Sequence, residues 1–143
     1  MEKKTYGVEE FLSRPQRLEE EIRKQRDHIA SLQSIVERRT TRLSFTADRN
    51  PSKNEKAFED VMIQIAEEKD KLDLLEKQLV KAETEVENFI RMIPDANQQT
   101  LLRARFVKGM SMTDIRENMM LGRTNSYKLY YAAMGAASNL FQK

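Results

Sequence analysis

Hydrophobic residues recur in the first third of the chain at alternating steps of four and three. Between residues 18 and 43 the stripe comprises Leu18, Ile22, Gln25, Ile29, Leu32, Val36, Arg39 and Leu43. This period places its members on one face of an α-helix, and charged runs such as RLEEEIRKQRD cover the other faces. The pattern predicts a helix that ends near residue 40. Pro15 marks its first turn, and a short turn or helix over 8–12 precedes it.

A second, longer stripe predicts a helix over 55–93. Nine of its ten positions are apolar, and they are Val61, Ile65, Glu68, Leu72, Leu75, Leu79, Ala82, Val86, Phe89 and Ile93. Each stripe needs a partner, and the economical arrangement is an antiparallel hairpin of the two helices. The polar segment 40–55, with its Asn50–Pro51 turn signal, would connect them. The second helix is longer, at about 58 Å against about 39 Å, so one end remains for a second chain or for the C-terminal unit.

The last third of the chain changes to shorter helices. Pro94 ends the second long helix and Asp95 is a suitable N-cap for the next one. Three short helices are expected over 95–108, 112–119 and 123–142, separated by Gly109 and Gly122. The predicted fold is therefore all-α. A long helical hairpin or coiled-coil arm spans 1–93, with a connection at about 40–55, and a three-helix unit of helix-turn-helix type spans 94–143.

Composition argues against catalysis. The chain has no Cys and a single His, and its acidic residues lie in runs mixed with Lys and Arg. Such runs are typical of solvated helix faces with intrahelical ion pairs, and His28 lies within a coiled-coil helix. We therefore expect no enzymatic activity, no metal site and no cofactor. No apolar run approaches the roughly 20 residues that span a bilayer, so we expect a cytoplasmic protein without a membrane partner.

Charge is distributed unevenly along the chain. Residues 1–93 hold 18 Lys and Arg against 20 Asp and Glu, whereas residues 94–143 hold seven against three, with no acidic residue after Glu117. A final helix with a basic, acid-free beginning could enter the major groove of DNA. The candidates for contact with base edges are Arg123, Thr124, Asn125, Tyr127 and Lys128. The candidates for contact with phosphates are Arg103, Arg105, Lys108 and Arg116.

The same residues leave a second interpretation open. Three short helices after a long one can also form a plain helical cap that binds protein. The small residues Ala132, Gly135 and Ala136 would let another helix pack closely against the last one. The residues alone favour DNA binding without excluding a protein-binding module.

The segment LLRARFVKGMSMTDIRENM, with RTNSYKLYYAAM after it, resembles the DNA-binding helix-turn-helix of region four of bacterial sigma factors. The residues on that pattern are Leu102, Arg105, Phe106, Gly109, Ser111, Asp114, Ile115 and Met119. The whole chain resembles small phage and prophage proteins of Gram-positive bacteria, some of which are described as late-gene regulators of the ArpU and RinA type. The ending that carries this second resemblance is Tyr127, Leu129, Tyr130, Ala133 and Met134.

Four positions depart from these patterns. Arg116 stands where a small residue is usual, Ser126 where a buried Val or Ile is usual, and Tyr130 where the family has His. The glycine of the turn is at Gly122 rather than at Met120. We expect any failure of the resemblance to show first at Arg116 and Ser126.

The resemblance implies a DNA-binding transcriptional regulator in a bacterial host cell. Its partner would be double-stranded DNA, and the arm would bind RNA polymerase, a second copy of the chain, or both. Two alternatives remain open at this point. One is a phage DNA-packaging adaptor similar to a small terminase subunit, and the other is a coiled-coil module that binds protein rather than DNA.

Overall fold

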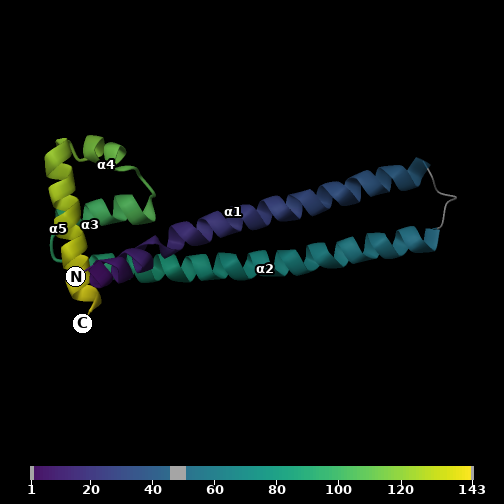
Figure 1. The fold of residues 1–143 in the computed structure, drawn as a ribbon, viewed down its shortest axis with the longest axis horizontal. Coiled ribbons are helices and arrows are strands. Elements are labelled where there is room, and N and C mark those ends of the chain that lie inside the picture. The colour runs from purple at the N-terminus through teal and green to yellow at the C-terminus, as the bar shows by residue number, and fades with distance from the viewer. Residues whose placement is uncertain (1, 46–50, 143) are drawn as a thin grey trace. The chain divides into compact units, whose positions relative to one another are not determined.

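All the regular secondary structure in the part of the chain that the structure describes is helical. This computed structural model describes the backbone of residues 2–45 and 51–142, and the side chains of residues 7–39 and 55–142. The helical segments of these residues are α1 (Glu2–Phe45), α2 (Pro51–Arg91), α3 (Ala96–Leu102), the π-helix η1 (Arg103–Val107), α4 (Met112–Asn118) and α5 (Arg123–Phe141) (Figure 1). The predicted all-α fold class is confirmed.

The chain divides into two compact units. The terminal unit comprises residues 1–18 together with 79–143, and the arm unit comprises residues 19–78. The first part of α1 and the last part of α2 thus belong to the same unit as α3, α4 and α5. The sequence predicted a domain boundary between residues 93 and 94. Whether 1–93 and 94–143 fold independently is a separate matter from these compact units, so that boundary stays a prediction.

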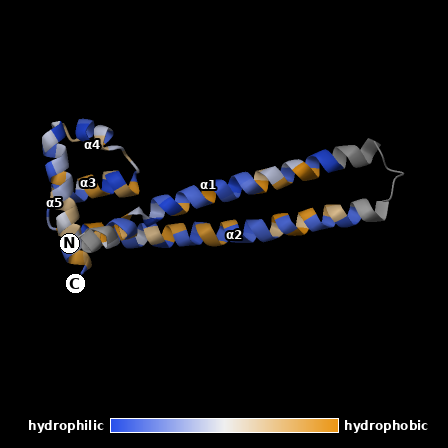
Figure 2. Ribbon diagram, viewed as in Figure 1, coloured by the Kyte–Doolittle hydropathy of each residue, from blue (hydrophilic) through white to orange (hydrophobic). Residues whose placement is uncertain are grey.

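Within the arm unit, α1 and α2 run antiparallel. Ile22, Ile29 and Leu32 of α1 and Ile65 of α2 are buried, in agreement with their places on the two stripes. Figure 2 shows hydrophobic residues recurring among hydrophilic ones along both helices, as the heptad pattern requires. The amphipathic pattern therefore accounts for the interior of the arm unit.

Two of the three polar exceptions in the stripes, Gln25 and Glu68, meet each other. Gln25 donates from Nε2 to the backbone carbonyl of Glu68 at 2.8 Å and to its Oε2 at 2.6 Å. Lys71 Nζ lies 3.1 Å from Glu68 Oε1. The hydrogen bond from Gln25, followed by that from Lys71, lowers the pKa of Glu68. A polar pair inside an apolar seam fixes the register of two helices, because shifting them would break the hydrogen bonds between Gln25 and Glu68 and place Gln25 against apolar residues.

The start of α1 corrects the sequence prediction. Pro15 does not mark the first turn, because α1 begins at Glu2 and Pro15 lies inside the helix. Proline removes one main-chain hydrogen bond from a helix interior. Here its ring is buried beside the fully buried Val8 and Leu12, so core packing offsets that loss. The segment 8–12 is consequently continuous with the main helix rather than a separate turn.

The predicted connection over 40–55 is mostly helical at its two ends. α1 continues to Phe45, and α2 begins at Pro51, the first helical position that proline prefers. The remaining residues, 46–50, lie outside the described part of the chain.

One hydrophobic core joins all the helical segments of the terminal unit. Its buried members are Val8, Leu12, Val86, Ile90, Ile93, Leu101, Leu102, Ala104, Phe106, Ile115, Ala133, Met134 and Ala137. At its edge the rings of Phe11, Phe89 and Phe141 form a cluster with centroids 5.3–6.0 Å apart. The first and last helices are thereby packed against the end of α2.

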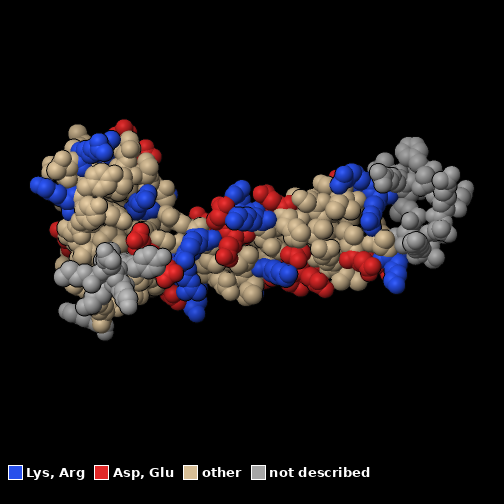
Figure 3. Space-filling model, in the orientation of Figure 1, with Lys and Arg blue, Asp and Glu red and all other residues tan. Residues whose placement is uncertain are grey.

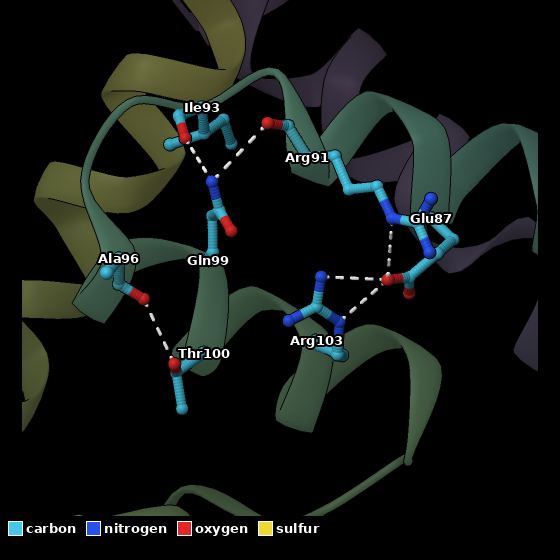
Figure 4. Close-up of polar contacts among 7 residues, drawn as sticks. All are labelled: Glu87, Arg91, Ile93, Ala96, Gln99, Thr100 and Arg103. Atoms are coloured by element: carbon cyan, nitrogen blue, oxygen red, sulfur yellow. Dashed lines mark hydrogen bonds and ion pairs between the residues drawn. The ribbon is translucent and has the colours of Figure 1, made fainter.

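The link from α2 to α3 is closed by side chains that bind the main chain. Asp95 caps α3 as predicted, because its Oδ1 accepts hydrogen bonds from the backbone N–H groups of Asn97 at 2.8 Å and Gln98 at 3.1 Å. The amide of Gln99 donates to the carbonyl oxygens of Arg91 and Ile93, which end α2 (Figure 4). The turn around Pro94 thus has few free polar groups.

The helix predicted over 95–108 has two parts, α3 and the π-helix η1. Lys108 N–H donates to the carbonyl of Arg103 at 3.0 Å, the five-residue spacing that defines a π-helix. From α1, Gln16 Nε2 donates to the carbonyls of Arg105 at 2.8 Å and Phe106 at 3.2 Å. Gln16 therefore satisfies carbonyl groups that the irregular helix exposes.

Candidate nucleic-acid interface

The turn between α4 and α5 is built by a specific capping arrangement. Ser111 caps α4 through its Oγ, which accepts a hydrogen bond from Asp114 N–H at 3.2 Å. At the other end Met120 N–H donates to the carbonyl of Glu117 and Leu121 N–H donates to that of Arg116. These two bonds form a Schellman motif, which requires a left-handed residue after the helix. That residue is Met120, with φ of 56°.

The turn corrects the expectation that Gly122 supplies the conformational break. Gly122 is the N-cap of α5 and has an ordinary extended conformation, with φ of −73° and ψ of 166°. The strained position is Met120, where the resemblance gives glycine as usual. Its side chain is 91% exposed. The turn therefore keeps its geometry although a non-glycine residue occupies the left-handed site.

The inward face of α5 explains the unusual Ser126. Ala133, Met134 and Ala137 are buried as expected for an inward stripe, and α5 packs against both α3 and α4. Ser126 lies about two to three turns earlier and is only 1% exposed. Its Oγ donates to the carbonyl of Arg123 at 2.7 Å. The buried hydroxyl is thus hydrogen-bonded, and a small polar residue replaces the usual Val or Ile without an unpaired group.

The outward face of α5 begins with the predicted base-contacting residues. All five are exposed, and they are Arg123, Thr124, Asn125, Tyr127 and Lys128. No carboxylate of the described residues lies within ion-pair distance of Arg123 or Lys128, and α5 itself contains no acidic residue. On its visible face, Figure 3 shows blue Lys and Arg side chains over the part of the terminal unit that holds α4 and the start of α5.

The residues predicted to contact phosphates fall into two groups. Lys108 is exposed and Arg116 is half-buried on α4. Arg103 and Arg105 are also half-buried, but each side chain forms hydrogen bonds with other residues of the chain. Arg105 donates from Nη1 to the carbonyl of Met110 at 3.1 Å, which holds the loop after η1. The first group is therefore the better placed for a ligand.

Arg103 forms an ion pair with Glu87 of α2 (Figure 4). Its Nε and Nη2 lie 2.9 and 2.8 Å from Glu87 Oε1, and Arg91 Nε lies 3.7 Å from the same oxygen. The hydrogen bond from Arg103 is the main cause that lowers the pKa of Glu87. This pair ties η1 to the end of α2, a contact that the heptad pattern of α2 did not predict.

Two tyrosines follow the predicted contact residues on α5. Burial is the main cause that raises the pKa of Tyr130, which stands where the family resemblance expects His. Its neighbour Tyr131 is 68% exposed, and their rings meet edge to face at 5.5 Å. Tyr131 was not among the predicted site residues, although its spacing of three from Lys128 and four from Tyr127 places it on their face.

A family profile matches the greater part of the chain. The profile of a family described as a protein of unknown function, DUF1492, matches residues 40–138. This range includes all of α2 and reaches into α5, but omits most of α1. No curated protein and no solved structure matches the chain.

Neither a membrane-spanning helix nor a metal-binding cluster occurs among the described residues. No helix combines the length and the apolar character needed to cross a membrane. No group of three or more His, Cys, Asp or Glu side chains is arranged to hold a metal ion.

Proposed function

The chain belongs to the DUF1492 family of proteins of unknown function, and we propose that it is a DNA-binding transcriptional regulator of phage or prophage genes. In this proposal α4, the turn at Met120 and α5 act as a helix-turn-helix. α5 lies in the major groove of promoter DNA, and α4 lies across the sugar–phosphate backbone. Catalysis plays no part in it.

The observation that carries the proposal is the outward, acid-free beginning of α5. Arg123 and Lys128 are exposed there without a carboxylate partner among the described residues, while Ser126 between them anchors the same turns in the core. A side chain that reads a base edge must extend from a rigid helix, because a mobile one would lose more entropy on binding. Arginine and asparagine form the paired hydrogen bonds that distinguish guanine and adenine.

The supporting cations define the expected orientation on DNA. Lys108 and Arg116 would contact phosphates on either side of the groove, which positions the helix without reading sequence. Arg103 and Arg105 would act through the fold, because their hydrogen bonds to Glu87 and to the carbonyl of Met110 hold the segment that precedes α4. The proposal thus divides the four predicted phosphate contacts into two that bind DNA and two that support them.

The arm unit would provide the protein contacts of the regulator, with RNA polymerase or with a second copy of the chain. Met62, Ile63 and Leu74 on α2 support this part of the proposal, because each is a large hydrophobic residue about half exposed. Light scattering on the purified chain tests self-association. A dimer mass supports a homodimer, a monomer at high concentration removes it, and a ring-sized mass favours a packaging adaptor instead.

A binding assay tests the proposed function. Fluorescence anisotropy would be measured on labelled duplexes that tile the native locus, with wild type and the double variant Arg123→Glu, Lys128→Glu. We expect the variant to bind at least tenfold more weakly, since it loses two attractive charges and gains two repulsive ones next to the groove. The matched control is Lys69→Glu with Lys81→Glu, which makes the same change of net charge at exposed positions on α2. Equal weakening by both double variants would attribute binding to net charge and refute the site.

A further inference from the structure

Tyr131 is the most exposed aromatic residue among the described side chains. It is 68% exposed, compared with 40% for Tyr127 and 42% for Phe141. Its ring and that of Tyr130 meet edge to face, and its hydroxyl forms no hydrogen bond with the other described residues. Exposing an aromatic ring loses the favourable free energy of burying it, so a ring held in solvent on a rigid helix is a candidate contact for a partner.

The helical register places Tyr131 on the same surface as the basic beginning of α5. Tyr127 precedes it by four residues and Lys128 by three, the two spacings that bring side chains together on a helix face. At 1.5 Å per residue, Tyr131 lies about 12 Å along the axis from Arg123. The surface from Arg123 to Tyr131 is thus long enough to lie along several base pairs.

The residues beyond Tyr131 leave room for a large partner. Gly135 lies four residues further on the same face, and nothing lies within 4 Å of the position that a Cβ atom would occupy there. Ala132 beside it is small and exposed. α5 itself carries no acidic residue, and the carboxylate that acts on this part of the surface is Glu9 of α1, which contributes to the raised pKa of Tyr130.

We propose that Tyr131 is a specificity-determining residue that contacts the C5-methyl group of thymine in the major groove. The inference rests on the proposed function and names the base that this part of the surface prefers. In the major groove thymine is the base that presents an apolar methyl group, which apolar side-chain surface contacts favourably. The ring of Tyr131 supplies such a surface, whereas Arg123 and Asn125 can supply only polar contacts. The rings of Tyr130 and Tyr131 meet edge to face with centroids 5.5 Å apart.

The test removes the methyl group from the DNA and the ring from the protein. Fragments of the native locus would be amplified with thymine or with uracil throughout, which differ only in the C5-methyl group. Affinities would be measured for wild type, Tyr131→Ala and Tyr131→Phe, with Met92→Ala as the matched control. Met92 is 64% exposed in the terminal unit but lies between α2 and α3, away from the basic edge of α5 in sequence.

Wild type should prefer the thymine fragment about three- to tenfold. Tyr131→Ala should reduce this preference to about one, while Tyr131→Phe and Met92→Ala retain it. The slope of log affinity against log salt concentration should stay the same in Tyr131→Ala, because no charge is removed.

Each other result overturns the inference. An undiminished thymine preference in Tyr131→Ala, equal wild-type binding to both fragments, or an equal loss in Met92→Ala would show that Tyr131 does not read the methyl group. The proposed function would survive these results if the reversal of Arg123 and Lys128 still weakened binding. Absence of wild-type binding to every fragment would instead refute the proposed function itself.

Discussion

The substitution Met120→Gly should stabilise the protein. Met120 has φ of 56° and is the left-handed residue of the Schellman motif that ends α4. In this conformation the Cβ atom of an L-residue crowds the backbone, and the cost is roughly 1–2 kcal/mol. Glycine has no Cβ atom and therefore no such cost.

Two smaller effects determine the net gain. Glycine has more conformational freedom in the unfolded chain, which cancels about 0.5–1 kcal/mol of the relief. Truncating the side chain itself costs little, because Met120 is 91% exposed and outside the core. The expected net stabilisation is about 0.5–1 kcal/mol, equivalent to a rise in Tm of about 1–3 °C for a chain of this size.

Urea unfolding monitored by tyrosine fluorescence suits this measurement. The chain has no Trp, and all four tyrosines, Tyr6, Tyr127, Tyr130 and Tyr131, belong to the terminal unit that contains the substitution. With a slope of about 2 kcal/mol/M, the unfolding midpoint should rise by about 0.25–0.5 M at unchanged slope.

Met120→Ala is the control for this prediction. It removes the same exposed side chain but keeps the Cβ atom, so its midpoint should stay close to wild type. The reasoning is refuted if Met120→Gly lowers the midpoint, or if Met120→Ala raises it as much.

Three further predictions concern the polar contacts of the two units. Gln16→Ala should lower the free energy of unfolding by about 1 kcal/mol, because two carbonyls of η1 lose their donor; a Gln16→Glu variant as stable as wild type would contradict this. The pKa of Glu87 is lowered in the folded state by Arg103, so its contribution to stability is complete above the ordinary value of 4.5 and is lost as pH falls through the lowered pKa. The difference in unfolding midpoint between wild type and Glu87→Gln should therefore shrink as pH falls below 4.5. A difference that does not change with pH would contradict this role of the Glu87 carboxylate. In the arm, Gln25→Leu should lower the Tm measured by circular dichroism, and adding Glu68→Leu should restore it, because the single change leaves Glu68 Oε2 without its donor in an apolar seam. A double variant no more stable than the single one would contradict the pairing.

The sequence predicted the parts of the fold that depend on regular periodicity. The two stripes identified both long helices, and Asp95 located the start of α3 correctly. The interruptions at Gln25 and Glu68 were visible as polar positions in apolar stripes. Their pairing across the hairpin could not be read from either stripe alone, because it depends on the register between two helices.

The errors occurred where tertiary packing overrides a local preference. Proline usually begins a helix, but Pro15 lies inside α1 because its buried surroundings stabilise it there. The π-helix η1 depends on Gln16, which lies 89 residues from its nearer carbonyl partner. No local pattern around Arg103–Val107 indicates that contact.

The candidate site was predictable in composition but not in detail. The acid-free stretch from Arg123 to Lys128 was evident, and the five residues proposed there are exposed. The ion pair between Arg103 and Glu87 could not be predicted, because the two residues are 16 positions apart on different helices. The left-handed conformation at Met120 was also missed, since Gly122 is the residue that a sequence pattern would choose for it.

The salt dependence of DNA binding tests the central claim most directly. The account places four cations against DNA, because Lys108 and Arg116 contact phosphates and Arg123 and Lys128 enter the major groove, where their charges also displace counterions, whereas Arg103 and Arg105 hold the fold. The account predicts that log affinity falls with log salt concentration with a slope of about −3.6 per bound chain, and about −1.8 for the neutral double variant Arg123→Gln, Lys128→Gln. A slope of about −5.4 would show that Arg103 and Arg105 also contact phosphates. A slope that is near zero, or that is unchanged in the neutral double variant, would contradict DNA binding through α5.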